Sequence, residues 1–138
     1  MLEQLADVHP DHWTQPFWEA AARHELVCQR CSQCGTMRMP PTPFCWNCRS
    51  KECEYPVLPG TGVVFSYSTT YFTASKASVP EDQLPYTVLI VDLDGAPGCR
   101  LIGAMVPADT DPPEIGQAVR VAWEDTAAGG ALPRFERV

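Results

Sequence analysis

The chain contains, from Cys31 to Cys48, the stretch CSQCGTMRMPPTPFCWNC, in which two Cys-x-x-Cys pairs stand ten residues apart. A Cys-x-x-Cys turn brings two thiolates to one corner of a tetrahedral zinc site, and a second such turn completes the four ligands. Gly35 follows the first pair and supplies the positive φ that such a turn commonly needs. The stretch predicts one structural zinc ion, with Cys31, Cys34, Cys45 and Cys48 as its ligands.

The cysteines also allow another pairing, because Cys28, Cys31 and Cys34 are equally spaced. A run of this kind is used in iron–sulfur ligation, but there it continues to a fourth cysteine followed by proline, which this chain lacks. The glycine after Cys34 favours the second and third cysteines of the run as the zinc pair. Cys28, Cys53 and Cys99 are then expected to be small apolar residues.

Before the cysteines, Thr14-Gln15-Pro16 is typical of a helix start, since proline is tolerated in the first turn. The sequence predicts a short helix over residues 14–24, with residues 1–12 as a tail or linker. An aromatic stripe at helical spacing is expected to pack against this chain or a partner. We divide the chain into a tail and helix (1–27), a zinc ribbon (28–56) and a barrel (57–138).

After the cysteines, the sequence breaks into short strands separated by turns. Alternation over residues 63–71 indicates a half-buried strand, and the apolar run 86–93 indicates a strand buried on both faces. Further strands are expected at 100–106, 119–123 and 134–138, with polar or proline-rich loops at 73–85 and 107–117. Five short strands with unequal loops favour a small Greek-key barrel of the OB type, with an SH3-like barrel as the alternative.

Composition limits the function classes. The seven cysteines are an odd number, which favours metal binding in a reducing compartment over a disulfide framework. The chain lacks an apolar run long enough for a membrane span and a start typical of a signal peptide, so we expect a cytoplasmic protein without a membrane partner. Residues 28–51 carry four basic residues and no acid, whereas residues 56–138 carry five basic residues and ten acids. The acidic barrel argues against nucleic-acid binding.

The sequence offers no evident catalytic set. All three histidines stand in the first 24 residues, and no nucleophile has a base near it in sequence. Asp92 and Asp94 flank a turn and are expected to be exposed turn residues. A zinc ion held by four thiolates has no open coordination position, so the metal is structural. We therefore expect no catalysis by this chain alone.

Several short motifs, taken in order, resemble a family of rubredoxin-like zinc ribbons fused to OB folds, which are acyl-CoA-associated proteins. The motifs are Phe17-Trp18-Glu19-Ala20, Leu26, Gln29-Arg30-Cys31, Cys34-Gly35, Pro40-Pro41, Cys45-x-x-Cys48, Gly60-x-Gly62, Pro85-Tyr86 and Ile115-Gly116-x-x-Val119. The resemblance covers about residues 13–138 and implies a mainly β protein: an N-terminal helix, a rubredoxin-like zinc ribbon and a five-stranded OB-fold barrel. The chain departs from the family pattern at Trp46, where proline is usual, and at Arg49, where glycine is usual.

Some members of this family are similar to the C-terminal domain of a hydratase chain that pairs with a lipid-transfer-type aldolase in bacterial steroid side-chain degradation. The resemblance implies a non-catalytic accessory subunit that binds and activates a thiolase-fold acyl-CoA aldolase or thiolase, in a hetero-oligomer around the enzyme's dimer. The partner would cleave a β-hydroxyacyl-CoA by retro-aldol chemistry. The alternative is a nucleic-acid-binding module in which Tyr67, Tyr71 and Phe72 stack on bases.

Two sets of residues are candidates for this role. The cations of the ribbon could lie near the phosphates of coenzyme A or near an acidic partner, or could form a solvated face; they are Arg38, Arg49 and Lys51. Large aromatic residues on the helix and on a zinc knuckle are candidates for the partner interface, since such residues are enriched there. They are Trp13, Phe17, Trp18 and Trp46.

Overall fold

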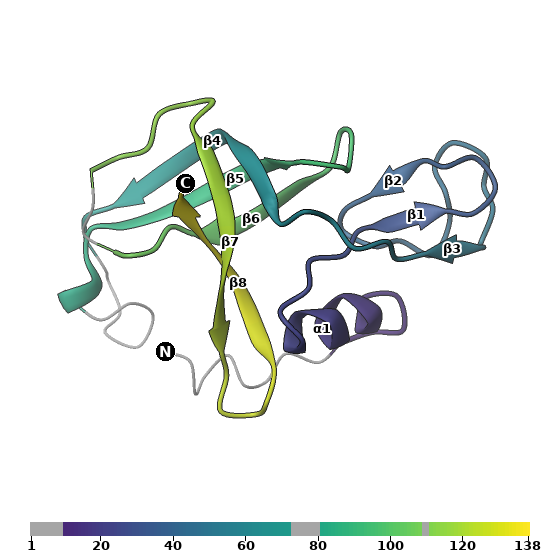
Figure 1. Ribbon diagram of the computed structural model, residues 1–138, viewed down its shortest axis with the longest axis horizontal. Helices are drawn as coiled ribbons and strands as arrows, with labels where there is room; N and C mark the ends of the chain where they lie inside the picture. Colours follow the sequence, from purple (N-terminus) through teal and green to yellow (C-terminus); the bar gives the residue numbers. More distant parts are fainter. Residues whose placement is uncertain (1–9, 73–80, 109–110) are drawn as a thin grey trace.

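A computed structural model describes residues 10–72, 81–108 and 111–138 and shows a helix, a small ribbon and a barrel along one long axis (Figure 1). The helix is α1 (Gln15–Ala22). The ribbon is a three-stranded antiparallel sheet with the order β2-β1-β3. Its strands are β1 (Gln29–Cys31), β2 (Met37–Arg38) and β3 (Cys53–Glu54). The predicted helix over 14–24 is confirmed, but it begins one residue later and ends two residues earlier than predicted.

The barrel consists of five antiparallel strands with the order β6-β5-β4-β7-β8. The strands are β4 (Thr61–Thr70), β5 (Tyr86–Leu93), β6 (Arg100–Ala104), β7 (Ala118–Asp125) and β8 (Ala131–Arg137), with a short 3₁₀ helix, η2 (Glu81–Gln83), before β5. A single parallel bridge between Met105 and Phe135 brings the two outer strands together and nearly closes the barrel. A partly open five-stranded Greek-key barrel is the OB architecture, so the OB prediction is confirmed.

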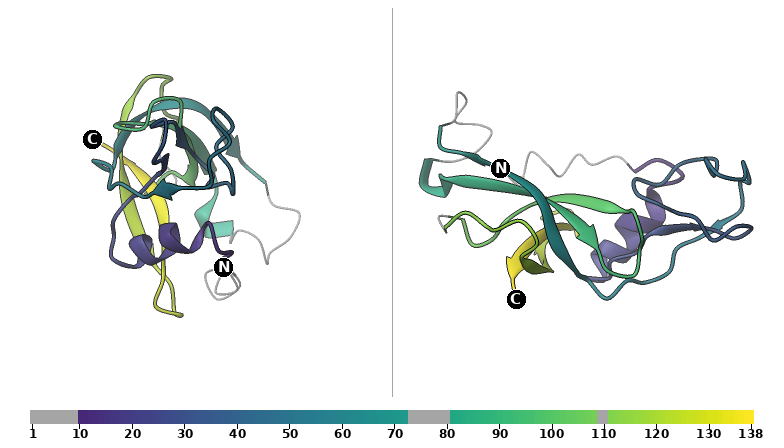
Figure 2. Two further views of the ribbon diagram at one scale, coloured as in Figure 1. Left: turned by 90° about the vertical axis from the view of Figure 1, so that its right-hand side faces the viewer. Right: turned by 90° about the horizontal axis from the view of Figure 1, so that it is seen from above.

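The helix is tied down at both ends by the residues around it. The Asp11 carboxylate accepts hydrogen bonds from the backbone N–H groups of Trp13 and Thr14, at 2.9 and 2.7 Å. At the other end, His24 takes a left-handed conformation with φ of 60°, and its N–H bonds back to the last turn. Phe17, Ala20 and Ala21 are the buried residues of the helix, and Phe17 and Ala20 belong to the hydrophobic core of the chain. α1 lies against β8 and beside the ribbon (Figure 2).

The strand β4 differs from the expectation of a half-buried strand with an apolar inner face. Val64 is buried, but its apolar neighbours Val63, Phe65 and Tyr67 are 38%, 46% and 39% exposed. A register shift between Val64 and Ser66 interrupts the pairing with β5, so the alternation in the sequence does not map onto one buried face. The predicted double-sided burial of residues 86–93 is also wrong, because buried and half-buried residues alternate along β5.

Glycine is required at position 62, where β4 packs closely against β5. A Cβ atom at this position would overlap the carbonyl oxygen of Asp92 and lie 2.7 Å from Cγ1 of Val91. Because the obstacle is backbone, we expect Gly62→Ala to destabilise the chain by about 2 kcal/mol, as overpacking of a core does. Urea unfolding measures this loss, and Gly130→Ala is the matched control, since its Cβ would meet Thr126 Oγ1 at 3.5 Å. Equal stability of the two variants would contradict this account of Gly62.

Parts of three predicted segments lie outside the described residues, namely residues 1–9 of the predicted tail, residues 73–80 of the predicted polar loop and residues 109–110 of the predicted proline-rich loop. Within the described residues, no helix has the length and apolar character needed to cross a membrane.

Candidate functional site

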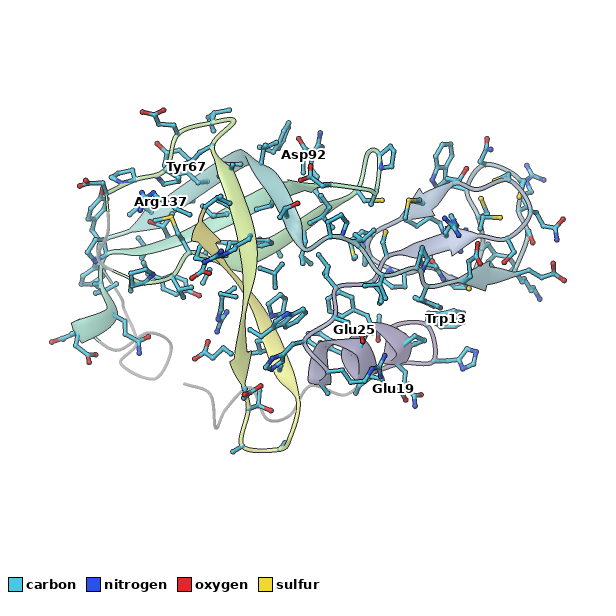
Figure 3. All side chains as sticks on the ribbon, in the orientation of Figure 1. Trp13, Glu19, Glu25, Tyr67, Asp92 and Arg137 are labelled. Carbon is cyan, nitrogen blue, oxygen red and sulfur yellow. The ribbon has the colours of Figure 1, made fainter. Side chains whose placement is uncertain are left out.

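The four predicted zinc ligands come together at the end of the ribbon. Cys31 and Cys34 come from the first knuckle and Cys45 and Cys48 from the second, and their four sulfur atoms all lie within 4.8 Å of one another. The Sγ atoms of Cys31 and Cys48 are 3.5 Å apart, and those of Cys34 and Cys45 are 3.6 Å apart. Four sulfurs at about 2.3 Å from a tetrahedral zinc ion would be about 3.8 Å apart, so the donor set fits the ion. Sulfur atoms gather in the ribbon in Figure 3.

The two knuckles have the same backbone geometry. In the first, the N–H of Gly35 donates to the carbonyl of Cys31 at 2.9 Å; in the second, the N–H of Arg49 donates to the carbonyl of Cys45 at 2.8 Å. Both fifth residues have positive φ, +77° at Gly35 and 65° at Arg49. The departures from the family pattern at Trp46 and Arg49 therefore leave the second turn intact.

The electrostatics of the sulfur cluster call for a cation. A hydrogen bond with Thr36, whose hydroxyl lies 3.1 Å from Cys34 Sγ, lowers the pKa of Cys34 to about 5. The backbone amide of Ser50 favours the thiolate of Cys48, but burial and the three neighbouring sulfurs outweigh it and raise the pKa of Cys48 to about 12. Four neighbouring thiols cannot all ionise to thiolates without a compensating positive charge. A divalent ion supplies this charge.

Arg49 occupies a backbone conformation that favours glycine. A side chain in the left-handed region costs roughly 1 kcal/mol relative to glycine. We therefore expect Arg49→Gly to raise the free energy of unfolding of the zinc-loaded protein by about 1 kcal/mol. The thermal midpoint should rise slightly as a result. Arg49→Ala is the control, because it removes the same charge and keeps the strain. A gain in the alanine variant equal to that in the glycine variant would assign the effect to charge instead.

The expectation that Arg38 presents a cation at the surface is wrong. Its side chain is 4% exposed, on β2, and its Nε donates to Gln29 Oε1 at 2.9 Å. Gln29 is itself fully buried and also bonds to the backbone of Thr42 and to the hydroxyl of Tyr55. Arg38 is thus part of a buried polar network inside the ribbon. Arg49 and Lys51 are exposed.

The remaining cysteines have a structural environment. Burial raises the pKa of Cys28 to about 12 and also raises the pKa of Cys99, which lies beside it. Both thiols are in the core where the ribbon joins the barrel, at 1% and 3% exposure. Cys53 is half-buried on β3. None of the three joins the sulfur cluster of the zinc site, which agrees with their predicted role as apolar residues.

The four candidate interface residues differ in exposure. Phe17 is 6% exposed and packs in the core of this chain, so its placement at a partner interface is wrong. Trp18 packs edge-on against the Phe17 ring at 5.1 Å between centroids and stays half-buried. Trp13 is 38% exposed and Trp46 is 75% exposed. Trp13 lies near the ribbon in Figure 3, where its carbonyl accepts from the Tyr55 hydroxyl at 2.7 Å.

The structure adds residues that the sequence did not single out. Phe44 is 52% exposed on the zinc-binding loop that also carries Trp46, with the ammonium of Lys51 5.2 Å from its ring centroid. We call the group of Phe44, Trp46, Arg49 and Lys51 the ribbon tip. Residues 40–43 contain three prolines, which indicate an irregular loop on the protein surface. This is the one sequence signal for the exposure of Phe44.

The chain joins a ribbon with a four-cysteine zinc site to an OB barrel, and this combination defines a class of two-module proteins. Comparisons with known protein families place the chain in this class. The chain belongs to the ChsH2 family. Residues 18–54 match the family described as the ChsH2 rubredoxin-like zinc ribbon domain, and residues 55–124 match the ChsH2 C-terminal OB-fold domain. The resemblance that the sequence motifs indicated is therefore confirmed.

Three relatives show the range of the family. A probable enoyl-CoA hydratase alpha subunit of Thermomonospora curvata is 38% identical over 86% of this chain and 36% of its own length. The 3-oxo-4,17-pregnadiene-20-carboxyl-CoA hydratase alpha subunit of Mycobacterium tuberculosis is 32% identical over 86% of this chain and 39% of its own. A DUF35 domain-containing scaffold protein of Methanocaldococcus jannaschii is 32% identical over 73% of this chain and 69% of its own. The chain thus spans less than two fifths of the two hydratase subunits.

Two solved structures share the architecture. A chain of the Ltp2-ChsH2(DUF35) aldolase superposes with a TM-score of 0.80 and 32% identity, over 93% of this chain and 96% of that one. A DUF35-family protein of unknown function from Sulfolobus solfataricus superposes with a TM-score of 0.66 at 15% identity, which shows the fold alone. These comparisons do not favour the nucleic-acid-binding alternative.

Proposed function

We propose that this protein is a non-catalytic accessory subunit that binds and activates a thiolase-superfamily acyl-CoA aldolase. The observation that carries the proposal is the match to a chain of the Ltp2-ChsH2(DUF35) aldolase over nearly the full length of both chains. The archaeal relative named as a scaffold protein supports a role in assembly rather than in chemistry. The two hydratase subunits are much longer than this chain, so their names do not assign a hydratase reaction to it.

In this proposal the partner performs the reaction. A retro-aldol cleavage breaks the bond between the α and β carbons of a β-hydroxyacyl-CoA: the β-hydroxyl loses its proton and becomes a carbonyl, and the α carbon gains a proton. The acid and base belong to the aldolase. The accessory subunit orders the entrance to the active site and excludes water around the acyl group. The name of the mycobacterial relative supports a steroid side chain as the acyl group.

The exposed residues of the ribbon supply the contacts. Trp46 is the most exposed tryptophan of the described chain, and an exposed tryptophan gains most when a partner covers it. Trp13 and Trp18, partly exposed at the helix, form the second part of the proposed partner surface. Arg49 and Lys51, which are exposed, carry the proposed contact with coenzyme A phosphates. Arg38 is buried and is no longer a candidate for this contact.

Charge reversal tests the phosphate contact. In the complex, we expect Arg49→Glu combined with Lys51→Glu to raise the KM for the acyl-CoA about tenfold, since a hydrogen bond to a charged group is worth about 1.5 to 3 kcal/mol. The kcat should change little. Arg23→Glu, at an exposed cation on the helix side, is the control. An unchanged KM in the double variant would leave the ribbon cations as a solvated face.

A further inference from the structure

The two zinc knuckles are alike in the backbone around their second cysteines, Cys34 and Cys48. Thr36 and Ser50 each stand two residues after that cysteine. Their carbonyl oxygens each accept from the N–H of the first cysteine of the same knuckle, at 2.8 and 2.9 Å. The backbone amides of Thr36 and Ser50 bond in turn to the sulfurs of Cys34 and Cys48. The backbone thus supports the two sulfurs in the same way.

The second cysteine of each knuckle is also the exposed one. Cys34 and Cys48 are exposed, whereas Cys31 and Cys45 are buried at 1% exposure each. A reagent or a competing ligand in solution therefore meets the metal site at Cys34 or at Cys48. Which of these two sulfurs leaves the metal first depends on how firmly the surrounding groups hold each thiolate.

The side chains around the two sulfurs are not alike, and they favour Cys34. The hydroxyl of Thr36 lies 3.1 Å from Cys34 Sγ. When this sulfur is a thiolate on zinc, the hydroxyl is the group that carries a proton, so it donates a charge-assisted hydrogen bond. Asn47, which belongs to the other knuckle, adds a side-chain hydrogen bond to the same sulfur. Cys34 is therefore held from both knuckles.

The corresponding side chains near Cys48 bond to Glu52. The hydroxyl oxygen of Ser50 accepts from the N–H of Glu52 at 3.1 Å. Gln33 occupies the position in the first knuckle that Asn47 has in the second, and its amide donates to the Glu52 carboxylate. The backbone amide of Ser50 remains as a donor to Cys48. The side chains that could have matched Thr36 and Asn47 are thus directed away from this sulfur.

We infer that Thr36, together with Asn47, holds the Cys34 thiolate on the zinc ion, and that Cys48 is the ligand at which the site opens. A hydrogen bond to a metal-bound thiolate withdraws negative charge from the sulfur, which makes the sulfur less reactive toward electrophiles. Loss of a residue that bonds to a metal ligand typically lowers metal affinity about 10- to 100-fold. This order of ligand loss concerns the free chain and is independent of the proposed function.

The opening ligand lies in the knuckle that carries part of the ribbon tip. Trp46 stands between Cys45 and Cys48, and Arg49 follows Cys48 directly. Loss of Cys48 from the metal would therefore release the loop that carries the ribbon tip, while the first knuckle keeps both of its ligands.

Limited alkylation of the zinc-loaded chain tests the order of ligand loss without a variant. A thiolate displaces iodide from iodoacetamide: the S–C bond forms, the C–I bond breaks, and iodide leaves with the electron pair. Trypsin cleaves after Arg30, Arg38 and Arg49, so the two knuckles lie on separate peptides, 31–38 and 39–49. Fragment masses then assign the modified cysteine. We expect Cys48 to be the first of the four ligands to be modified.

Removal of the Thr36 hydroxyl gives the second measurement. Thr36→Val should speed the transfer of zinc to a colorimetric chelator about tenfold and bring the alkylation rate of Cys34 up to that of Cys48. Ser50→Ala is the matched control and should change both rates little, because it removes the hydroxyl that bonds to the Glu52 backbone. Modification of Cys34 before Cys48 in the wild-type chain would overturn the inference, as would equal zinc transfer rates in the two variants.

Discussion

Removal of the zinc ion with a strong chelator should unfold the ribbon and leave the barrel folded. The ribbon strands β1, β2 and β3 contribute seven residues in total, too few to form a core, and its interior is the polar network of Gln29 and Arg38. Structural zinc sites contribute about 10 to 16 kcal/mol of apparent binding free energy, which in such small modules is folding free energy. Most of the buried core cluster, including Leu89, Val91 and Phe135, comes from the barrel.

Metal analysis and two-dimensional NMR would show this selective loss. We expect about one zinc per chain and negligible iron. Cys31→Ser and Cys34→Ser should both lose the metal and the ribbon signals, because each removes one of four ligands. Cys28→Ser is the control and should retain zinc, since Cys28 lies outside the sulfur cluster. Loss of zinc in Cys28→Ser together with retention in Cys34→Ser would contradict the ligand assignment.

Truncation of Trp46 should have the largest effect on complex formation among single surface substitutions. Its side chain is 75% exposed and stands on the second zinc knuckle, whose backbone is fixed by the metal ligands on either side. A rigid, exposed tryptophan loses little conformational freedom when a partner covers it, and interface tryptophans cost about 2 to 4 kcal/mol on truncation. Trp46→Ala should therefore raise the Kd for the aldolase by about thirtyfold or more.

Phe72→Ala is the matched control for this measurement. Phe72 has nearly the same exposure, 77%, but follows β4 in the barrel and is not part of the ribbon tip. Isothermal titration of the aldolase with both variants and the parent chain gives the comparison. Equal weakening by both substitutions would show that general surface hydrophobicity, and not the ribbon tip, determines binding.

The sequence predicted the features that depend on local spacing. Two Cys-x-x-Cys turns determine a metal site because each turn is short, and the structure brings the four sulfurs together as expected. The five strands of the barrel were recognisable because turns rich in glycine and proline separate them. The positive φ at Arg49 shows that ligand spacing outweighs the preference for glycine at that position.

The sequence did not predict which side of an element is buried. Arg38 and Phe17 were expected at the surface, but Arg38 lies opposite buried Gln29 across the ribbon and Phe17 faces the barrel. The exposed apolar residues of β4 reflect a bulge, whose position depends on the pairing of β4 with β5. In each case, contacts between segments far apart in the chain determine which side chains are buried. Local sequence patterns do not reveal these contacts. The same applies to the apolar groove that α1, residues 39–41, β6 and β8 form together.

Reconstitution of aldolase turnover tests the central claim most directly. The purified Ltp2-type aldolase, this protein and their mixture are each assayed with a β-hydroxyacyl-CoA, and release of the carbonyl product is followed. We expect no turnover with this protein alone, little or none with the aldolase alone, and full cleavage with the mixture at a fixed stoichiometry. Full cleavage by the aldolase alone, at a rate that this protein does not change, would contradict the account.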